Sequence, residues 1–299
     1  MRRYAFFPGC FIQVRLPHLE ALSRRILGEL GVELVDVEGF TCCPEAVTLS
    51  VDKMSWRVMA ARNLSLAEEL GLDILTLCNA CTVTLVEAQE EFRKHPELLE
   101  EVNKKLAVIG KKYTGKVKVR HFARFLYEEY GVEKLKEHVK RPLENLNLAA
   151  HYGCHFIRPS EVYEEFDDPE HPVSLDRLIE ATGARSVDYM EKEKCCGGGI
   201  LGIKEEDALK MTKEKLDEVK KVNADAMISI CPFCSIMYEG SQKKIEKLFE
   251  TEYGIPVLYY PQVLGLAMGF TPEEMGFKLN RVRANKVLEK VGGDEKGRD

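Results

Sequence analysis

The chain has 299 residues, 45% of them hydrophobic, which is enough for two domains of ordinary size with real cores. The formal net charge is −6 and no long basic stretch occurs, which argues against nucleic acid as the main partner. The apolar start of the chain is ended by Pro8 too early for a signal peptide, and the apolar stretch at residues 255–270 is too short to span a bilayer. We therefore expect a soluble, cytoplasmic protein with no membrane segment.

Short apolar runs alternate with stretches of helical periodicity along the whole chain. Strands are predicted at residues 4–7, 32–35, 72–77, 117–119, 148–152, 186–189, 226–230 and 256–260. The clearest helices are predicted at residues 19–30, 55–70, 82–93, 97–112, 122–130, 205–222 and 236–249, with a further one ending at Gly183. This alternation predicts an α/β fold with parallel strands.

The elements follow the same order in the two halves of the chain. We predict two pseudo-symmetric repeats, each a small parallel, Rossmann-like sheet flanked by helices. The first half is assigned to residues 1–140 and the second to 148–291, with the boundary placed in residues 131–147, which are charged, contain Pro142 and show no clear strand. Residues 292–299 are predicted to be a polar tail. Ligands of such sheets gather at the carboxyl ends of the strands, so each half should have a site there, near the interface, on which three loops distant in sequence converge.

The ten cysteines form two sets of five with matching spacing. Each set has a single cysteine, an adjacent pair and a Cys-x-x-Cys motif, and 34 residues separate the pair from the motif. The first set is Cys10, Cys42, Cys43, Cys78 and Cys81, and the second is Cys154, Cys195, Cys196, Cys231 and Cys234. In a cytoplasmic protein such thiols are expected to bind metal rather than to form disulfides, and thiolate suits iron–sulfur clusters and zinc.

Five thiols per half are one more than a simple site needs. A tetrahedral zinc site and a cubane four-iron cluster each take four ligands. Either one thiol in each half is free and reactive, or the cluster is not a simple cubane and the adjacent pair includes a bridging thiolate. Zinc in the first half is an alternative. The glycines at residues 197–199 would let backbone N–H groups approach the sulfurs of the second site.

The duplicated motif resembles the cysteine-rich CCG signature, whose best-known member is the B subunit of heterodisulfide reductase. The resemblance runs from Cys10 to Cys234 and includes Tyr-Gly-Cys-His-Phe-Ile-Arg-Pro at residues 152–159 and Cys-Cys-Gly-Gly-Gly at 195–199. It implies a noncubane [4Fe-4S] cluster held by the five cysteines of each half. The first half departs from the signature because Pro44, and not glycine, follows its cysteine pair.

The same resemblance implies a function. It implies the catalytic iron–sulfur subunit of a heterodisulfide reductase-type complex, which reductively cleaves a CoM-S-S-CoB-like disulfide. In the mechanism proposed for the family, one substrate sulfur binds an iron of each cluster and each cluster supplies one electron. This sequence has no ferredoxin motif, so electrons would come from a ferredoxin-like subunit of the C type, linked to a flavin-containing subunit of the A type.

Two residues near Cys154 are candidates for roles beyond metal binding. His155 could give a proton to a departing thiolate and would then be catalytic, or it could simply pack or cap a loop. Arg158 could bind an anionic group of the substrate, or it could form a structural ion pair.

Two other functions stay open. Relatives in sulfur-oxidising bacteria and archaea are thought to act on sulfur bound to a carrier protein, which would change the direction of the reaction. A protein of another class would only transfer electrons or assist assembly, with zinc in place of a cluster or without a substrate site of its own.

Overall fold

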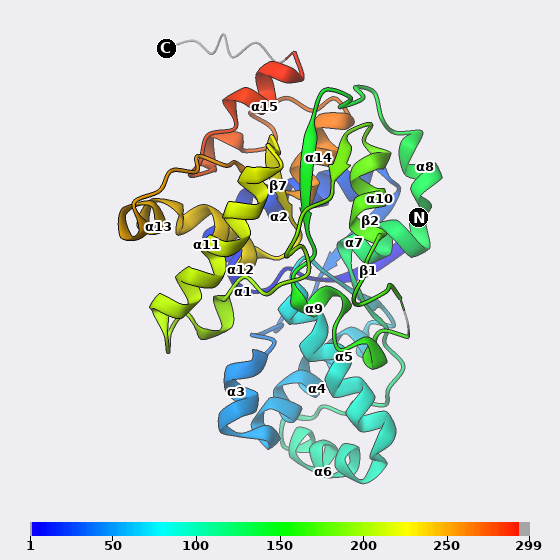
Figure 1. Cartoon of the computed structure of the whole chain (residues 1–299). Coiled ribbons are helices and arrows are strands. Elements are labelled where there is room, and N and C mark those ends of the chain that lie inside the picture. The colour runs from blue at the N-terminus through cyan, green and yellow to red at the C-terminus, as the bar shows by residue number, and fades with distance from the viewer. Residues whose placement is uncertain (1, 165, 293–299) are drawn as a thin grey trace.

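The computed structural model describes residues 2–164 and 166–292, and its strands form two sheets (Figure 1). The strands are β1 (Arg2–Phe7), β2 (Val32–Asp36), β3 (Asp73–Thr76), β4 (Val119–His121), β5 (Asn147–His151), β6 (Arg185–Val187), β7 (Ala226–Ser229) and β8 (Val257–Tyr259). The first sheet has the order β2-β1-β3-β4 and the second the order β6-β5-β7-β8. All pairings are parallel, so the predicted pair of pseudo-symmetric parallel sheets is confirmed.

The helices follow the strands in matching order. Those of the first half are α1 (Cys10–Arg15), α2 (Pro17–Glu29), α3 (Glu45–Val51), α4 (Lys53–Glu69), α5 (Asn79–Lys94), α6 (Pro96–Leu106), α7 (Phe122–Arg124) and α8 (Val132–Lys136), with a π-helix at Phe125–Gly131. Those of the second half are α9 (Cys154–Ile157), α10 (Ser174–Ala181), α11 (Glu205–Lys221), α12 (Pro232–Ser235), α13 (Gln242–Phe249), α14 (Tyr260–Ala267) and α15 (Asn285–Lys290), with a π-helix at Ile236–Gly240. Short 3-10 turns lie at Ala107–Ile109, Ser160–Val162, Gly198–Ile200 and Phe277–Leu279.

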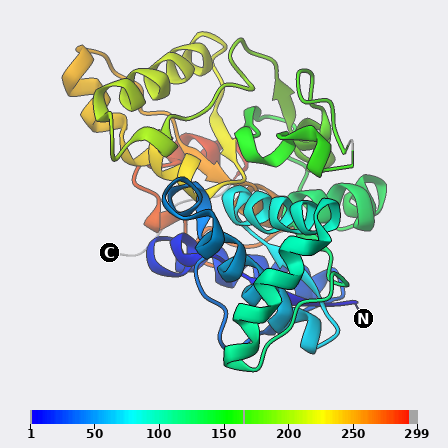
Figure 2. The same ribbon diagram turned by 90° about the horizontal axis from the view of Figure 1, so that it is seen from below.

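Side chains alternate between the two faces of each strand, as the pleat requires. In β1, Tyr4 and Phe6 belong to one buried core, while Ala5 and Phe7 belong to the other. Both cores include residues of both halves, so the two sheets share their hydrophobic interior. In the view from below, most helices of the first half (blue to cyan) and most of the second (green to orange) lie on opposite sides (Figure 2).

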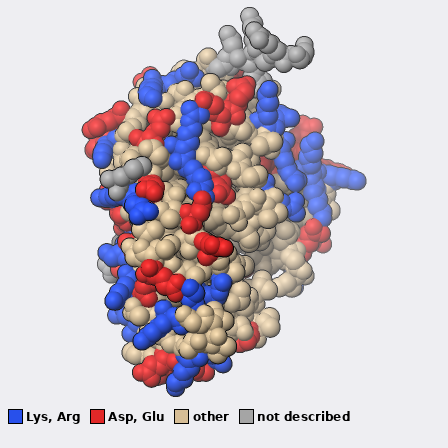
Figure 3. All heavy atoms as spheres, turned by 180° about the vertical axis from the view of Figure 1, so that it is seen from behind, with Lys and Arg blue, Asp and Glu red and all other residues tan. Residues whose placement is uncertain are grey.

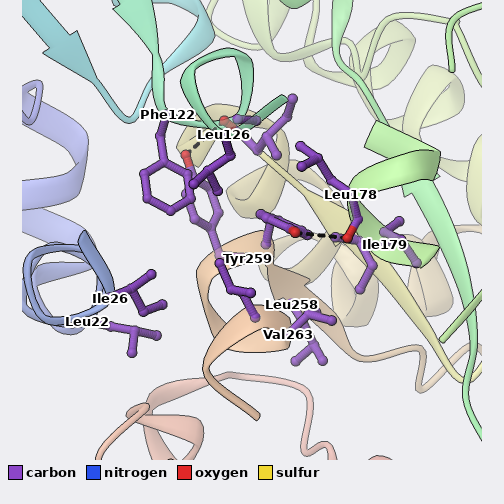
Figure 4. Close-up of a cluster of buried hydrophobic side chains, with 14 of the residues drawn as sticks. Leu22, Ile26, Phe122, Leu126, Leu178, Ile179, Leu258, Tyr259 and Val263 are labelled. Atoms are coloured by element: carbon purple, nitrogen blue, oxygen red, sulfur yellow. Dashed lines mark hydrogen bonds between the residues drawn. The ribbon is translucent and has the colours of Figure 1, made fainter. Parts of the chain in front are cut away.

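The last helices of each half pack against the other half. After β4, α7, the π-helix and α8 contact α10 of the second half. After β8, α14 contacts α2 of the first half. Figure 4 shows the result: Ile26 and Phe122 lie in one cluster with Leu178 and Val263. Burying such side chains stabilises a protein by about 1.5–3 kcal/mol each, so this exchange ties the halves together.

Some predicted boundaries were wrong. The strand expected at residues 117–119 is β4 at Val119–His121, and the one expected at 186–189 is β6 at Arg185–Val187. Val117 is buried, but it lies outside the ladder with β3, which begins at Val119. Burial and strand pairing therefore do not coincide at this residue, and the apolar pattern reports only burial.

The division at residues 140 and 148 stays a prediction, although a helix, α8, lies within the stretch expected to join the halves. The polar tail predicted at residues 292–299 lies outside the described residues apart from Gly292. Among the residues that the structure describes, no helix is both long and apolar enough to cross a bilayer. On the face seen in Figure 3, basic and acidic side chains are interspersed.

Candidate metal centre

The cysteines lie at the carboxyl ends of the central strands in both sheets. Cys10 begins α1 just after β1, and Cys78 caps the N-terminus of α5 after the neighbouring strand β3. Cys154 begins α9 after β5, and Cys231 caps α12 after β7. In each sheet the chain turns in opposite directions from these two strands, and such switch points are where parallel sheets bind ligands. Figure 1 shows α1, α9 and α12 at the junction of the two parts of the molecule.

The backbone has the same conformation just before the first cysteine of each set. Gly9 has φ 77° and ψ 152°, and Gly153, at the same place in the second half, has φ 72° and ψ 155°. Only glycine adopts this conformation without strain. Space is also limiting, because a Cβ on Gly9 would stand 2.9 Å from the Cys81 sulfur. These glycines therefore let the loops with Cys10 and Cys154 approach the Cys-x-x-Cys motifs.

The ten sulfurs form one continuous row across the molecule, which we call the cysteine row. Neighbouring thiols in this row interact in the order Cys10, Cys42, Cys43, Cys81, Cys78, Cys231, Cys234, Cys196, Cys195 and Cys154. From either end, the row has the same order: the single cysteine, the adjacent pair and then the Cys-x-x-Cys motif. The two halves are therefore related by a pseudo-two-fold axis, which passes between Cys78 and Cys231. The predicted convergence of three loops holds in each half, and the two sites meet at this central pair.

Every third thiol in the row accepts hydrogen bonds from both of its neighbours, which favours its thiolate form. Cys43, Cys195 and Cys231 each lie between two thiols that donate hydrogen bonds to them. These bonds lower the pKa of Cys43 to about 3 and that of Cys195 to about 2, and they also lower the pKa of Cys231. Cys196, on the donating side, has its pKa raised to about 12 by Cys195. Negative charge is thus stabilised on one sulfur in each half and on one at their junction, and a metal would bind these sulfurs.

Backbone donors also reach the sulfurs of the second half. The N–H of Gly197 donates to the Cys195 sulfur and that of Gly198 to the Cys196 sulfur, both at 3.4 Å. In the first half, where Pro44 replaces the glycine, the Glu45 N–H and the Thr84 hydroxyl donate to Cys43 instead. The departure from the CCG signature therefore changes the donors and leaves the thiolate supported.

Two side chains on the axis hold the strand ends that precede Cys78 and Cys231. The Tyr259 hydroxyl donates to the Ile230 carbonyl at 2.9 Å and also to the Leu77 carbonyl. His121 Nε2 lies 3.0 Å from the same Ile230 carbonyl, while its Nδ1 accepts from the Ala123 N–H, so the proton is on Nε2. His121 and Tyr259 end the equivalent strands β4 and β8, so each half supplies one of these donors.

The loops with the cysteine pairs are held by helices behind them. Asn63 of α4 donates to the Cys42 carbonyl at 3.1 Å and accepts from the Thr41 N–H at 3.0 Å. Thr212 of α11 donates to the Cys196 carbonyl at 2.9 Å. Both helices thereby fix the pair of cysteines that their half brings to the site.

All five thiols of the first set line one cavity of about 280 Å³. Phe233 of the second half also lines it, with its ring centroid 4.4 Å from that of Phe11. Cys10 and Cys42 are exposed at the outer end of the row, whereas Cys154 and Cys195 at the other end are half-buried. A pocket of about 460 Å³ lies beside the exposed pair.

The donor set fits an iron–sulfur cluster in each half. Each half has five soft thiol donors and a glycine that clears space for sulfur, and in the first half the five thiols also line one cavity, as such a group requires. Across residues 2–164 and 166–292, no three Cys, His, Asp or Glu side chains are grouped around a point that suits a single metal ion. The thiols are instead spread along the row.

The other predicted site residues lie at the edge of this centre. His155 follows Cys154 in α9, is half-buried, and lies near the Glu87 carboxylate of α5. Its backbone carbonyl accepts from the Tyr163 hydroxyl at 2.6 Å. The Arg158 guanidinium donates to the Pro169 carbonyl, which is a structural contact within its own loop.

Sequence reasoning missed the groups behind the cysteines. His121 and Tyr259 could have been found as polar residues ending equivalent strands. Lys215 had a clearer signal, because it falls on the apolar face of the amphipathic helix α11 with Ala208, Thr212 and Val219. It is one of the few fully buried charged side chains in the described chain.

Comparison with known proteins places this centre in a family. The model of a cysteine-rich domain, CCG, matches residues 4–86 and 148–239. The B subunit of the "Ferredoxin:CoB-CoM heterodisulfide reductase" of Methanosarcina mazei is 40% identical over 97% of this chain and 97% of its own. The "8-methylmenaquinol:fumarate reductase membrane anchor subunit" of Wolinella succinogenes is 32% identical over 96% of this chain and 99% of its own.

A solved structure shares the fold. A hypothetical protein from Helicobacter pylori superimposes with a TM-score of 0.77 at 16% identity, covering 94% of this chain and 52% of that chain, so this chain spans about half of it. At that identity the likeness concerns the fold alone. The family match in both halves and the identity of 40% along nearly the whole chain show that this chain belongs to the family of heterodisulfide reductase B subunits, with its cysteine-rich CCG domain present twice.

Proposed function

We propose that this protein is the iron–sulfur subunit of a heterodisulfide reductase-type complex and that it reduces a disulfide between two small thiols. The observation that carries the proposal is the cysteine row, in which two sets of five thiols meet at Cys78 and Cys231. Two metal centres side by side suit the cleavage of one bond that needs two electrons. The relatives named as B subunits of heterodisulfide reductases support the same assignment.

Each set of five cysteines would hold one noncubane [4Fe-4S] cluster. Such clusters, when bound, supply electrons one at a time. The protein's own part is to hold the ten thiols, to line the first site with Phe233 of the other half, and to fix the strand ends through His121 and Tyr259. Zinc in the first half remains the alternative to be tested by metal analysis.

We assign His155 the role of a proton donor to the departing thiolate. It directly follows Cys154 and is half-buried, and it interacts electrostatically with the Glu87 carboxylate. Arg158 is proposed to bind an anionic group of the substrate. Because its guanidinium donates to the Pro169 carbonyl, that contact would have to open or be shared when the substrate binds.

Electrons are proposed to come from a ferredoxin-like subunit of the C type, with a flavin-containing subunit of the A type behind it. This chain contains no ferredoxin-type cysteine run of its own. The M. mazei relative carries ferredoxin in its name as the electron donor. A cytoplasmic location stays a prediction.

A second candidate function is favoured by the W. succinogenes relative. That protein is named as a subunit of a fumarate reductase, and it aligns with 96% of this chain. This chain would then carry electrons without binding a disulfide. The cysteine row would also carry electrons, but electron transfer alone does not call for two centres side by side, and the two candidates are separated by whether a disulfide reaches the site.

The first experiment is to measure iron and acid-labile sulfide on protein purified without oxygen. About eight of each per chain are expected for two four-iron clusters. About four iron with one zinc would mean that only one half is redox-active, and the paired mechanism would have to be abandoned. Cys231→Ala and Cys196→Ala should each lose the second-half cluster and disulfide reduction.

The second experiment separates the two candidates. The absorption and EPR spectra of the purified protein are recorded before and after adding a small-molecule thiol or disulfide. A disulfide reductase should change its cluster spectra on this addition. Two intact clusters with unchanged spectra and no turnover would favour the electron-carrying function.

A further inference from the structure

We propose that His151 and Lys215 form a buried donor pair that makes the second-half cluster the more easily reduced of the two. The pair has no equivalent in the first half, so the two sites of this duplicated protein would differ in reduction potential. The proposal rests on the two clusters of the proposed function. It goes beyond that function by assigning the order in which the two clusters are reduced.

Lys215 is a buried ammonium group at the back of the second site. It is 1% exposed, and its Nζ donates to the Lys194 carbonyl at 2.7 Å, the Lys192 carbonyl at 2.9 Å and His151 Nδ1 at 3.2 Å. These three acceptors match the three protons of an ammonium group. Burial lowers the pKa of Lys215 to about 8, so the group is still mostly charged at neutral pH.

The position of this charge relative to the cysteines is fixed by the backbone. Lys194 directly precedes Cys195, so the ammonium holds the loop with the cysteine pair from behind. Within the described part of the chain, no carboxylate forms an ion pair with Lys215. Its positive charge interacts most strongly with Cys234 and Cys196 of the second site, and also with the Glu193 carboxylate and Cys195.

His151 carries a hydrogen-bond donor that has no partner. Its ring is fully buried at the end of β5 and packs edge-on against Tyr238, with ring centroids 4.7 Å apart. Because Nδ1 accepts from Lys215, the proton of the neutral imidazole is on Nε2, and that atom has no hydrogen-bond partner among the described residues. Leaving a buried N–H unpaired is costly, so a partner is expected when the site is filled.

The free N–H lies at the second metal centre. The point where a Cβ on Gly153 would stand is 2.9 Å from Asn79 Nδ2 of the first half, whose amide donates to the Tyr152 carbonyl, 3.4 Å from the Cys234 sulfur and 3.8 Å from His151 Nε2. The space left by this glycine is thus bordered by a donor without a partner and by a cysteine ligand. A cluster sulfur is an acceptor that would satisfy the donor there.

The equivalent positions of the first half lack both functions. Phe7 stands three residues before Cys10, as His151 does before Cys154, and it has no donor. Arg62 stands 19 residues after Cys43, as Lys215 does after Cys196, but it is only half-buried. Its guanidinium donates to the Gly39 carbonyl at 2.7 Å, on the exposed side of the loop.

The expected consequence is a higher reduction potential in the second half. Reduction adds negative charge, which a nearby buried cation stabilises and solvent screens poorly. An N–H donated to a cluster sulfur acts in the same direction. Arg62 is screened by water, so it should raise the potential of the first-half cluster less. At an intermediate potential, the second cluster is then reduced while the first is still oxidised.

The test is an anaerobic redox titration of the whole protein, followed by EPR without any thiol or disulfide present. Wild-type protein should give two components with different midpoint potentials. In Lys215→Met the higher one should fall by about 59 mV or more, which is a tenfold change in the one-electron equilibrium. His151→Phe, which places the first-half residue in the second half, should lower the same component, and Lys215→Arg should keep it close to wild type.

Two further variants assign the components and provide the control. In a Cys234→Ala background, which lacks the second cluster, Lys215→Met should not change the component that remains. Arg62→Met is the matched control and should shift either component less than Lys215→Met does. Unchanged potentials in both Lys215→Met and His151→Phe, at full iron content, would overturn the proposal.

The result can be separated from the fate of the proposed function. Iron content and the midpoint potentials are measured before any substrate is added. If two clusters are present and the potentials do not respond, the donor pair is wrong and the disulfide reductase assignment is unaffected. If Lys215→Met loses iron, His151→Phe and Lys215→Arg still decide the question.

Discussion

Tyr259 is the residue whose loss tests most directly how the fold holds both sites. It is 3% exposed and its hydroxyl donates to the carbonyls of Leu77 and Ile230, each one residue before a Cys-x-x-Cys motif. Tyr259→Phe removes the hydroxyl and keeps the ring, so no cavity forms. The same variant disturbs both strand ends at once, and we therefore expect both halves to bind iron less firmly.

The size of the effect follows from the hydrogen bonds removed. The hydroxyl has one proton, which the two carbonyls share, and its removal leaves buried acceptors without this donor, at a cost of about 1–3 kcal/mol. His121 still donates to the Ile230 carbonyl, which keeps the loss from rising further. For a chain of this size, about 2 °C in Tm corresponds to 1 kcal/mol, so Tm should fall by about 2–6 °C.

The assay is thermal unfolding under nitrogen, with iron measured on the same samples. Tyr260→Phe is the matched control, because the Tyr260 hydroxyl is buried and makes a single bond, to the Leu178 carbonyl at 2.8 Å, away from the cysteines. It should lose about half as much stability and no iron. If Tyr259→Phe keeps its iron and falls no further in Tm than Tyr260→Phe, the hydroxyl does not position the cysteines.

Two further predictions concern the first half. Gly9→Ala should remove about half of the iron, because the backbone there has φ 77° and the new Cβ would stand 2.9 Å from the Cys81 sulfur. Gly28→Ala is the control and should keep all of the iron, because a Cβ at that position would have no atom within 4 Å. The Arg57 guanidinium lowers the pKa of Glu91 from 4.5 to about 2, so this carboxylate stabilises the fold above pH 4.5 and the effect is lost as the pH falls toward 2. Glu91→Gln should therefore show a smaller fall in Tm across that range, measured on protein freed of iron, and an equal fall would count against the ion pair.

Much of the fold was accessible from the sequence because burial and periodicity agree in most elements. The apolar runs of β1, β5 and β7 are buried on both faces, and α11 begins at Glu205 as its pattern predicts. The helix α3 was missed because Val47 and Val51 point to solvent, so it has no apolar face for a periodicity to reveal. The packing of α14 against α2 could not be predicted either. A helical pattern shows that one face of the helix is buried, but it does not show which element covers that face.

The metal centre also has features that the sequence predicts and features that it does not. The spacing of the cysteines predicted two convergent sets, and the thiols do lie together in each half. That Cys78 and Cys231 would be neighbours could not be read from spacing, because it depends on how two sheets pack. The contact of Arg158 with Pro169 could not be predicted from the sequence either, because it depends on the path of a loop without periodicity. The roles of His155 and Arg158 remain predictions.

A duplicated site is under no physical constraint to stay symmetric away from its ligands. The cysteine row keeps its order from both ends, and Gly9 and Gly153 keep the same backbone angles, because sulfur positions leave little freedom. The residues one step behind have diverged: His151 stands where the first half has Phe7, and Lys215 where it has Arg62. A change there alters charge and hydrogen bonding without moving a ligand. If the two centres differ in potential, the cause is therefore to be sought in this second layer and not among the ten cysteines.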